Sequence, residues 1–197
     1  MRYPTEQKAR TRAKILSVAS RLFRERGAEA NGIGSVMKEI GLTKGGFYRH
    51  FDSRDHLYVE AIANAFTDMG NAMVAAAEAA PKGQQLKAVI ERYLSMEHLY
   101  SPGTGCIMST LGSDIARQPL AVRRQINRSM QAYRERLLPY MPGGTAEEKA
   151  ASFSLLYPSM VGLLIAARTL ADKQAQEQLL ARARDFFIRT YTTLTIQ

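Results

Sequence analysis

The chain has 197 residues, of which 46% are hydrophobic and 23% are charged. This composition is typical of a globular protein and excludes a disordered tail or a fibre. The formal net charge is +9, and the first 60 residues contain 12 basic and 7 acidic side chains. A basic excess favours a polyanion such as the DNA backbone as a partner, while a solvated basic helix face is the alternative that composition leaves open.

Export, membrane insertion and metal binding each have a sequence pattern that this chain does not show. Charged residues follow Met1–Thr5, and the longest apolar run, Leu155–Ala167, contains Pro158 and is shorter than the roughly 20 residues of a membrane span. Cys106 is the only cysteine, which excludes an intrachain disulfide, and no Cys/His cluster indicates zinc. We expect a cytoplasmic protein without cofactor, metal or membrane contact.

The first three predicted helices are one long amphipathic helix and two short ones. Residues 5–26 carry an apolar stripe at helical spacing. The stripe consists of Ile15, Leu16, Ala19, Leu22 and Phe23. A short helix over residues 33–40 should end at Gly41, and a second one over residues 44–51 should be capped by the hydroxyl of Thr43.

Six further helices are predicted in the rest of the chain, separated by proline and glycine clusters. Their ranges are 54–80, 83–100, 105–117, 119–138, 146–171 and 174–195, and Asp52 or Ser53 can cap the first of them. No segment alternates with a period of two, so we predict an all-α fold of about nine helices. We place a domain boundary after Ser53, which gives domains over residues 1–53 and 54–197.

The two short helices around Gly41 are the most informative feature of the sequence. Helices of this length bury little surface alone, so we expect them to pack on the first helix. The side chains predicted to make this packing are Val36, Met37, Ile40, Leu42, Phe47 and Phe51. Such a three-helix unit presents its last helix outward, and in a helix-turn-helix protein that helix enters the major groove of DNA.

The outer face of the last short helix carries the candidate DNA contacts. Lys44 can donate to a guanine edge or a phosphate, and Gly45 and Gly46 allow close approach of the backbone. Tyr48 and His50 can donate hydrogen bonds to phosphates. The predicted DNA-binding residues are Ser35, Thr43, Lys44, Gly45, Gly46, Tyr48, Arg49, His50 and Arg54.

The stretch from Gly41 to Leu57 resembles the DNA-binding signature of the TetR/AcrR family of bacterial regulators. After the glycine the signature has an apolar residue, Ser or Thr, a basic or polar residue, Gly, a small residue, an aromatic or apolar residue and Tyr. One position further on it has His or Tyr, then Phe, and a basic residue three positions after that; this chain fits each position. Two departures are Gly32, where the family has Ser or Thr, and Arg54, where Lys is usual; Ser35 could partly replace the contact missing at Gly32. The resemblance implies an N-terminal helix-turn-helix domain and a C-terminal helical domain for effector binding and dimerisation.

The helix predicted over residues 146–171 is the main indication of a second subunit. It is apolar nearly all round, and a monomer of this size can scarcely bury such a helix. The family resemblance implies that it forms a four-helix dimer interface together with residues 174–195. Two helix-turn-helix units related by twofold symmetry are also needed to bind the two halves of a palindrome. We therefore expect a homodimer on palindromic double-stranded operator DNA.

The family resemblance also implies an effector pocket between the DNA-binding unit and the dimer interface. Methionine and tyrosine side chains make adaptable walls that suit a lipophilic or aromatic small molecule, although ordinary core packing has the same composition. The candidate pocket residues are Phe66, Met69, Met73, Tyr93, Met96, His98, Cys106, Met108, Met130, Tyr133 and Tyr157.

Cys106 supports an alternative mode of regulation on the same scaffold. It stands at the start of a predicted helix, and a thiol at a helix N-terminus can react as the thiolate. It would then sense oxidants or electrophiles through a sulfenic acid or an adduct. A buried apolar role is the other interpretation of a lone cysteine.

The sequence disfavours two other classes of protein, an enzyme and a helical adaptor. A phosphate-binding Gly-Lys-Ser/Thr loop, a His-Glu-x-x-His pair and a Gly-x-Ser-x-Gly elbow are all missing, so we predict no enzyme and no catalytic residue. A helical adaptor without DNA binding would not need Lys44 or Tyr48. We predict a transcriptional repressor whose effector stabilises a dimer that does not fit the operator, with activation as the other possible outcome of binding.

Overall fold

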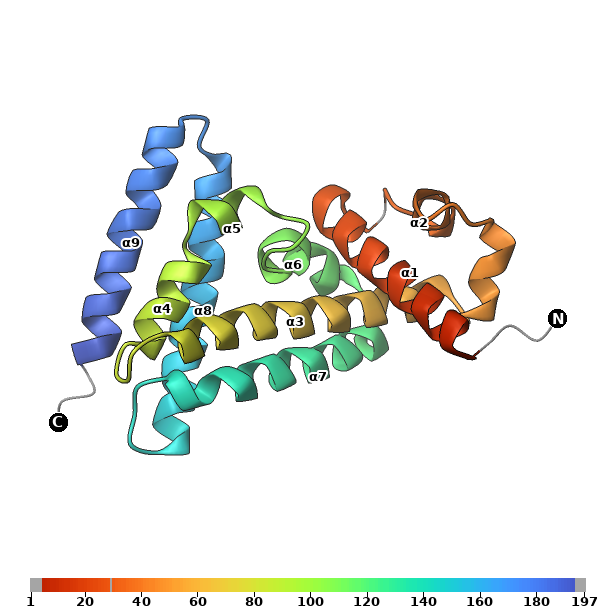
Figure 1. Ribbon diagram of the computed structural model, residues 1–197. Coiled ribbons are helices and arrows are strands. Elements are labelled where there is room, and N and C mark those ends of the chain that lie inside the picture. The colour runs from red at the N-terminus through yellow and green to blue at the C-terminus, as the bar shows by residue number, and fades with distance from the viewer. Residues whose placement is uncertain (1–4, 29, 194–197) are drawn as a thin grey trace. The chain divides into compact units, whose positions relative to one another are not determined.

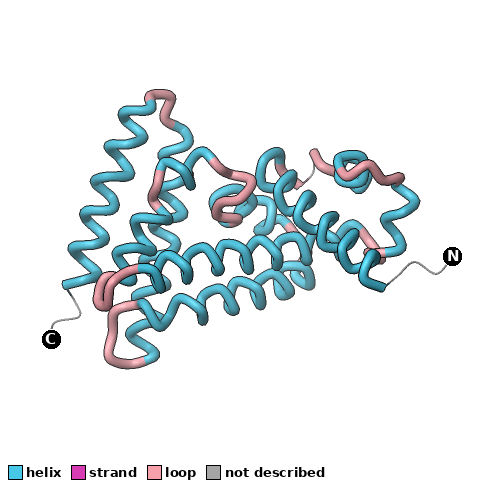
Figure 2. Tube along the Cα trace, viewed as in Figure 1, coloured by secondary structure: helices cyan, strands magenta, loops and turns pink. Residues whose placement is uncertain are grey.

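The computed structural model describes residues 5–28 and 30–193. Helices make up most of this part of the chain (Figure 1), and no strand occurs in it (Figure 2), which confirms the predicted all-α fold. The elements are α1 (Thr5–Arg26), α2 (Ile33–Glu39), the 3-10 helix η1 (Lys44–Arg49), α3 (Arg54–Ala79), α4 (Gln85–Tyr93), α5 (Met96–Tyr100), α6 (Met108–Arg117), α7 (Leu120–Leu137), the 3-10 helix η2 (Leu138–Tyr140), α8 (Ala146–Thr169) and α9 (Lys173–Thr193).

Two elements differ from those predicted. The helix expected over residues 83–100 is interrupted, because Ser95 has extended backbone geometry and its hydroxyl accepts a hydrogen bond from the His98 amide at 3.0 Å, which starts α5. The second short helix is a 3-10 helix and not an α-helix. Gly45 and Gly46 explain this difference, because glycine is a poor α-helix former and 3-10 geometry is common in short pieces.

Contacts within the chain divide it into two units. The head unit contains the residues up to Phe66 together with Pro102–Ser129, and the body unit contains Thr67–Ser101 together with the residues from Met130 on. The division therefore falls within α3 and within α7. The end of the DNA-binding domain after Ser53 stays a prediction.

The core of the head unit lies between α1, α2 and η1. Ile15 and Leu22 of α1, Met37 of α2 and Phe47 of η1 are completely buried. Helix α2 packs on α1 as predicted, and η1 packs mainly on α2. Leu42 was expected in this core but is 40% exposed, because the turn before it places its side chain at the rim of a surface pocket beside Lys8 and Thr11 of α1.

The core of the body unit is built around aromatic side chains. Helix α9 packs on α4 and α8. Phe153 and Tyr157 of α8 stack with ring centroids 5.2 Å apart, and Tyr133 and Tyr93 contact Tyr157 at 5.3 and 6.0 Å. These rings bury a large apolar area in one cluster, which stabilises the unit.

Helix α8 begins at a capping box that the sequence analysis did not identify. The Thr145 hydroxyl accepts from the Glu148 amide at 3.1 Å, and the Glu148 carboxylate accepts from the Thr145 amide at 3.0 Å. The helix then continues through Pro158 to Thr169. This reciprocal cap fixes where α8 starts.

The outer face of α8 is apolar and exposed. Leu155 is 65% exposed and Ile165 is 45% exposed. By length and composition α8 could also cross a membrane, since an 18-residue window has a mean hydropathy of 1.7, with 33% of it buried. Core and interface helices of soluble proteins meet the same criterion. The exposed face is therefore a surface in need of a partner.

Candidate nucleic-acid interface

The turn between α2 and η1 depends on Gly41. Its φ of +73° lies in the left-handed region, which glycine adopts without strain. The turn is closed by hydrogen bonds from the Gly41 amide to the Lys38 carbonyl at 3.0 Å and from the Leu42 amide to the Met37 carbonyl at 2.9 Å. The glycine that we predicted to end the second helix therefore does so, and it sets the direction in which η1 leaves α2.

Helix η1 separates a buried side from an exposed side. Phe47 is buried and stacks on Phe51 with ring centroids 5.5 Å apart. Tyr48 is 61% exposed, and Lys44 and Arg49 are exposed as well. Gly45 and Thr43 are also exposed, and Gly46 is half-buried. The residues expected to face DNA thus lie on the outer side of η1.

The expected cap of η1 is missing. Thr43 has the extended backbone of an N-cap residue, but its side chain accepts no capping hydrogen bond. Its hydroxyl is therefore left for other partners. The Thr43 hydroxyl could therefore donate a hydrogen bond to a DNA phosphate, and this contact stays a prediction.

A basic pocket of about 310 Å³ lies where α1 meets η1. It is lined by Lys8, Thr11, Leu42, Gly46, Arg49 and His50. The His50 Nδ1 atom is buried and has no hydrogen-bond partner among the described residues. Burial lowers the pKa of His50, and the positive charges of Lys8, Arg12 and Arg49 lower it further. An anion in this pocket would offset these charges.

Three cations at this surface lack a neutralising partner in the described part of the chain. Lys8, Lys44 and Arg49 form no ion pair with any residue that the structure describes. Arg12 of α1 differs, because it pairs with Glu60 of α3. The potential of the surface is consequently positive beside η1, as binding to a polyanion requires.

Lys8 and Thr11 were not among the residues predicted to bind DNA. They are three positions apart on α1, so both point to the same side of the helix. The basic start of the chain contained this signal, but only the packing of α1 against η1 brings the two residues beside Arg49 and His50.

Two other predicted DNA-binding residues have structural contacts. The Ser35 hydroxyl donates to the carbonyl of Gly32 at 2.8 Å, so it supports the first turn of α2. The Arg54 guanidinium donates to the Ala28 carbonyl at 2.6 Å. Both side chains therefore help to hold the head unit together, and their predicted phosphate contacts stay predictions.

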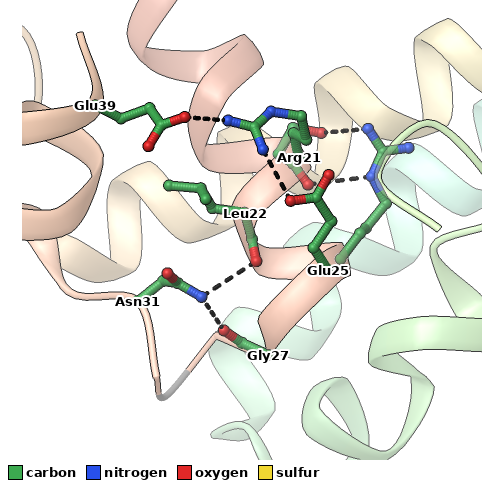
Figure 3. Close-up of polar contacts among 8 residues, drawn as sticks. Arg21, Leu22, Glu25, Gly27, Asn31 and Glu39 are labelled. Atoms are coloured by element: carbon green, nitrogen blue, oxygen red, sulfur yellow. Dashed lines mark hydrogen bonds and ion pairs between the residues drawn. The ribbon is translucent and has the colours of Figure 1, made fainter. Parts of the chain in front are cut away.

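Polar side chains fix α2 against α1 (Figure 3). Arg21 of α1 pairs with Glu39 of α2 at 2.6 Å. The Asn31 side chain is buried and donates to the carbonyls of Leu22 at 3.1 Å and Gly27 at 2.9 Å. A buried amide that bonds two main-chain carbonyls holds the start of α2 in one position, which in turn positions η1.

A buried arginine joins α1 to the segment before α6. Arg24 is buried, and its guanidinium donates to the Gly105 carbonyl at 2.9 Å and to the Ser20 carbonyl at 3.1 Å. Helix α1 also packs on α6. The head unit is thus completed by residues far along the chain.

The start of α3 is held by a chain of polar contacts. The Ser53 hydroxyl accepts from the His56 amide at 3.0 Å, which confirms Ser53 as a cap. The His56 ring bonds Glu60 at 2.6 Å, and Glu60 pairs with Arg12. Helix α3 is therefore tied to α1 one turn beyond the DNA-binding segment.

Most of the candidate effector residues are buried. The body unit contains Met69, Met73, Tyr93, Met96, His98, Met130, Tyr133 and Tyr157, and the head unit contains Phe66, Cys106 and Met108. His98 contacts the Tyr93 ring at 4.8 Å, and its Nδ1–H donates to the Tyr93 carbonyl at 2.6 Å. Burial lowers the pKa of His98 to about 4. The body-unit rings are packed against one another, so a role in effector binding stays a prediction.

Cys106 precedes the first turn of α6 and is completely buried. Its carbonyl accepts from the Ser109 hydroxyl at 2.9 Å. An oxidant or electrophile would reach the thiol only after local opening of this segment. The sensor hypothesis stays a prediction.

Comparison with known proteins agrees with the helix-turn-helix geometry. The model of bacterial regulatory proteins of the tetR family matches residues 15–61. YxaF of Bacillus subtilis, an uncharacterized HTH-type transcriptional regulator, is 29% identical over 169 residues, which cover 83% of this chain and 87% of that protein. Residues 15–61 therefore match the DNA-binding segment of the TetR family. AcrR of Shigella flexneri, an HTH-type transcriptional regulator, is 40% identical over 57 residues, which are 28% of this chain and 26% of that protein.

Solved structures share the fold of this chain over nearly its whole length. A TetR transcriptional regulator from Chloroflexus aurantiacus is 20% identical, with a TM-score of 0.74 and coverage of 95% of this chain and 98% of that one. A regulator structure from Saccharomonospora viridis in complex with choline is 17% identical, with a TM-score of 0.70 and coverage of 93% and 98%. The matched segment and the shared fold are those of DNA-binding transcriptional regulators.

Proposed function

We propose that this TetR-family regulator is a cytoplasmic repressor that binds a palindromic operator as a homodimer. A small lipophilic or aromatic effector releases it from the operator. The observation that carries the DNA-binding part is the outer side of η1, where Lys44, Tyr48 and Arg49 are exposed beside the basic pocket formed with Lys8. No acidic residue lines that pocket in the described part of the chain, so phosphates would meet an uncompensated positive surface.

In this proposal η1 reads the major groove and the pocket binds the backbone. Lys44 is the first residue of η1 and Tyr48 lies near its end, and from these exposed positions side chains can reach base edges or flanking phosphates. Lys8 and Arg49 flank His50 and would receive a phosphate oxygen between them. Gly45 has no atom within 4 Å of an added Cβ, so its function would be to let the DNA approach rather than to relieve a clash within the protein.

The exposed face of α8 supports the homodimer. Leu155 and Ile165 of α8 and Phe186 of α9 are large apolar side chains that remain in solvent in one subunit. Between Lys149 and Arg168 the helix has no charged residue. Two copies that bury this face against each other would form a helical interface without desolvating any charge.

The aromatic cluster of the body unit supports a lipophilic effector. Tyr93, Tyr133 and Tyr157 combine apolar rings with polar tips, and buried methionines lie in the same unit. An effector that enters between these rings would replace contacts of the rings with one another by contacts of the rings with the effector. It must bind the released form of the dimer more tightly than the operator-bound form, because only differential affinity shifts such an equilibrium.

The experiment that tests this function is fluorescence anisotropy with DNA from upstream of the protein's own gene. The wild-type protein, Lys44→Ala and Tyr48→Ala are titrated over a range of salt concentrations, with Lys173→Ala at the start of α9 as a control. We expect the wild-type protein to prefer this DNA, with a steep salt dependence. Lys44→Ala and Tyr48→Ala should bind it more weakly, and Lys173→Ala should bind it like the wild type. Equal binding of unrelated DNA by all four proteins would contradict the proposal.

A further inference from the structure

We propose that the body unit has a second ligand site, for a small organic anion with an apolar body, separate from the expected effector pocket. The site is a groove of about 660 Å³ formed by the loop between α3 and α4, the segment from η2 to α8, and the last turn of α9. This size lies within the range of roughly 300 to 1,000 Å³ that is usual for small-molecule sites.

The groove combines cationic, hydroxyl and apolar groups. Lys82 and Lys149 supply two ammonium groups from different segments, and Tyr191 and Thr192 supply hydroxyls from α9. Leu86 and Met141 belong to its apolar wall. Burial raises the pKa of Tyr191, so its hydroxyl stays a hydrogen-bond donor at neutral pH. A ligand with an anionic head and an apolar body would use all of these groups.

The charge of the groove is not compensated by the protein. Among residues 5–28 and 30–193, its lining includes the two lysines and no acidic residue, and neither lysine forms an ion pair. Glu148 is next to Lys149 in sequence, but its carboxylate accepts from the Gly144 amide at 2.6 Å and the Thr145 amide at 3.0 Å. These hydrogen bonds lower the pKa of Glu148 and keep its charge at the cap of α8.

One wall of the groove is held in a fixed conformation. Gly143 has a φ of +135°, and a Cβ on this residue would come within 2.6 Å of the Glu148 Cβ and 2.9 Å of the Lys149 amide nitrogen. The Ser152 hydroxyl donates to the Pro142 carbonyl at 3.0 Å, which ties the same loop to α8. A preformed wall lowers the entropy that ligand binding would cost.

The groove lies apart from the face that we assign to the dimer. Tyr191 follows the buried Phe187 by one helical turn, and their rings contact at 6.2 Å, so Tyr191 lies on the inner side of α9. Phe186, which is 54% exposed, belongs to the other side of that helix. None of the groove residues is among the expected effector residues, so the two sites can be occupied independently.

The chemistry of the groove selects its class of ligand. An inorganic anion would not use the apolar wall, and a neutral apolar molecule would gain nothing from the two lysines. Lysine ammonium groups are compact point charges that pair with a carboxylate or a sulfonate without demanding one geometry. The ligand class is therefore an amphipathic organic acid.

Two fluorescent probes of nearly the same shape test this site. The anionic probe is 1-anilinonaphthalene-8-sulfonate, and the neutral probe is N-phenyl-1-naphthylamine, which lacks the sulfonate. Each is titrated by fluorescence into the full-length wild-type protein, the double variant K82Q/K149Q and the control K173Q. Lys173 is an exposed lysine at the opposite end of α9 from the groove.

We expect the double variant to bind the anionic probe about tenfold more weakly, since two charge contacts are lost. The neutral probe should bind all three proteins alike, and K173Q should bind both probes like the wild type. Unchanged binding of the anionic probe by the double variant would overturn the proposal. An equal loss of both probes would also overturn it, because the lysines would then shape the protein and not recognise a charge.

Discussion

The outer side of η1 and the outer face of α8 are both exposed, but they leave opposite chemistry in solvent. Around η1, Lys8, Lys44 and Arg49 have no ion pair with any described residue, whereas α8 leaves Leu155 and Ile165 uncovered on a helix without central charges. The first surface requires a charged partner whose binding weakens with salt, and the second requires an apolar partner whose binding hardly depends on salt. The type of partner can thus be inferred from the unpaired charges on one surface and the uncovered apolar side chains on the other.

The largest expected effect comes from placing a charge on the α8 face. Leu155→Glu should make the protein monomeric in analytical ultracentrifugation, because two buried carboxylates would face each other across the interface. Loss of the second head should weaken operator binding on the order of a thousandfold. Gln131→Glu adds the same charge at an exposed position of α7 and should change neither property. A Leu155→Glu protein that stays dimeric would show that the subunits meet elsewhere.

Acidification should destabilise the body unit through His98. Its folded pKa of about 4 lies below the ordinary histidine pKa of 6.5, so stability is fully present above pH 6.5 and is lost as pH falls toward 4. Between pH 7.5 and 5 we expect a loss of about 2 kcal/mol in the free energy of unfolding, measured in urea at one protein concentration.

The control for this effect is His98→Asn, which keeps a donor near the Tyr93 carbonyl but does not titrate. Its unfolding free energy should be lower at pH 7.5 and should change less with pH. If wild type and variant lose stability in parallel, other groups are responsible.

Removing Lys8 should weaken DNA binding without changing its sequence preference. Lys8→Ala is expected to cost about five- to tenfold in affinity and to lower the slope of log affinity against log salt by about 1, as for one lost phosphate contact. Lys14→Ala is the matched control, because Lys14 is exposed on the same helix but does not line the pocket. Anisotropy titrations at several salt concentrations measure both values, and identical slopes for the two variants would exclude the pocket from the interface.

The smallest effect concerns His50 and has the opposite sign to that of His98. Burial and three nearby cations lower its pKa in the unbound protein, and a phosphate in the pocket would raise it. The complex then takes up a proton, so operator affinity should rise about threefold as pH falls from 7.5 to 5.5. His50→Gln should remove this rise. A wild-type affinity that is constant over this range would indicate that no phosphate approaches the ring.

The parts of the head unit that follow from local rules were predictable from the sequence. Gly41 marks a left-handed turn, Ser53 caps α3, and Phe47 is buried while Tyr48 is exposed, as the spacing indicated. Leu42 was placed wrongly because its spacing fits the core, while its actual position depends on how η1 leaves the turn. The pocket with Lys8 was not predictable, because it joins residues about 40 positions apart.

The body unit was less predictable for a physical reason. At Ser95 the chain can either continue the helix or end it and start α5 with a capping hydrogen bond from the His98 amide to the Ser95 hydroxyl. The spacing of apolar residues does not reveal which of the two is more stable. Tyr93, Tyr133 and Tyr157 would have the same sequence pattern in a packed core and in a ligand pocket. The groove with Lys82 and Lys149 is formed by loops and a helix end, where periodicity contains no information.

The hydrogen bond from Arg24 to Gly105 limits how this protein can be recombined with its relatives. Exchanging only the first 66 residues would transplant the arginine without the carbonyl that it binds, and would leave a buried guanidinium facing a foreign loop. A working hybrid has to import Pro102–Ser129 along with the N-terminal segment. The head unit is therefore encoded by two separate segments of the gene. A new operator preference is acquired more readily by point substitutions on η1 than by exchange of the whole head unit.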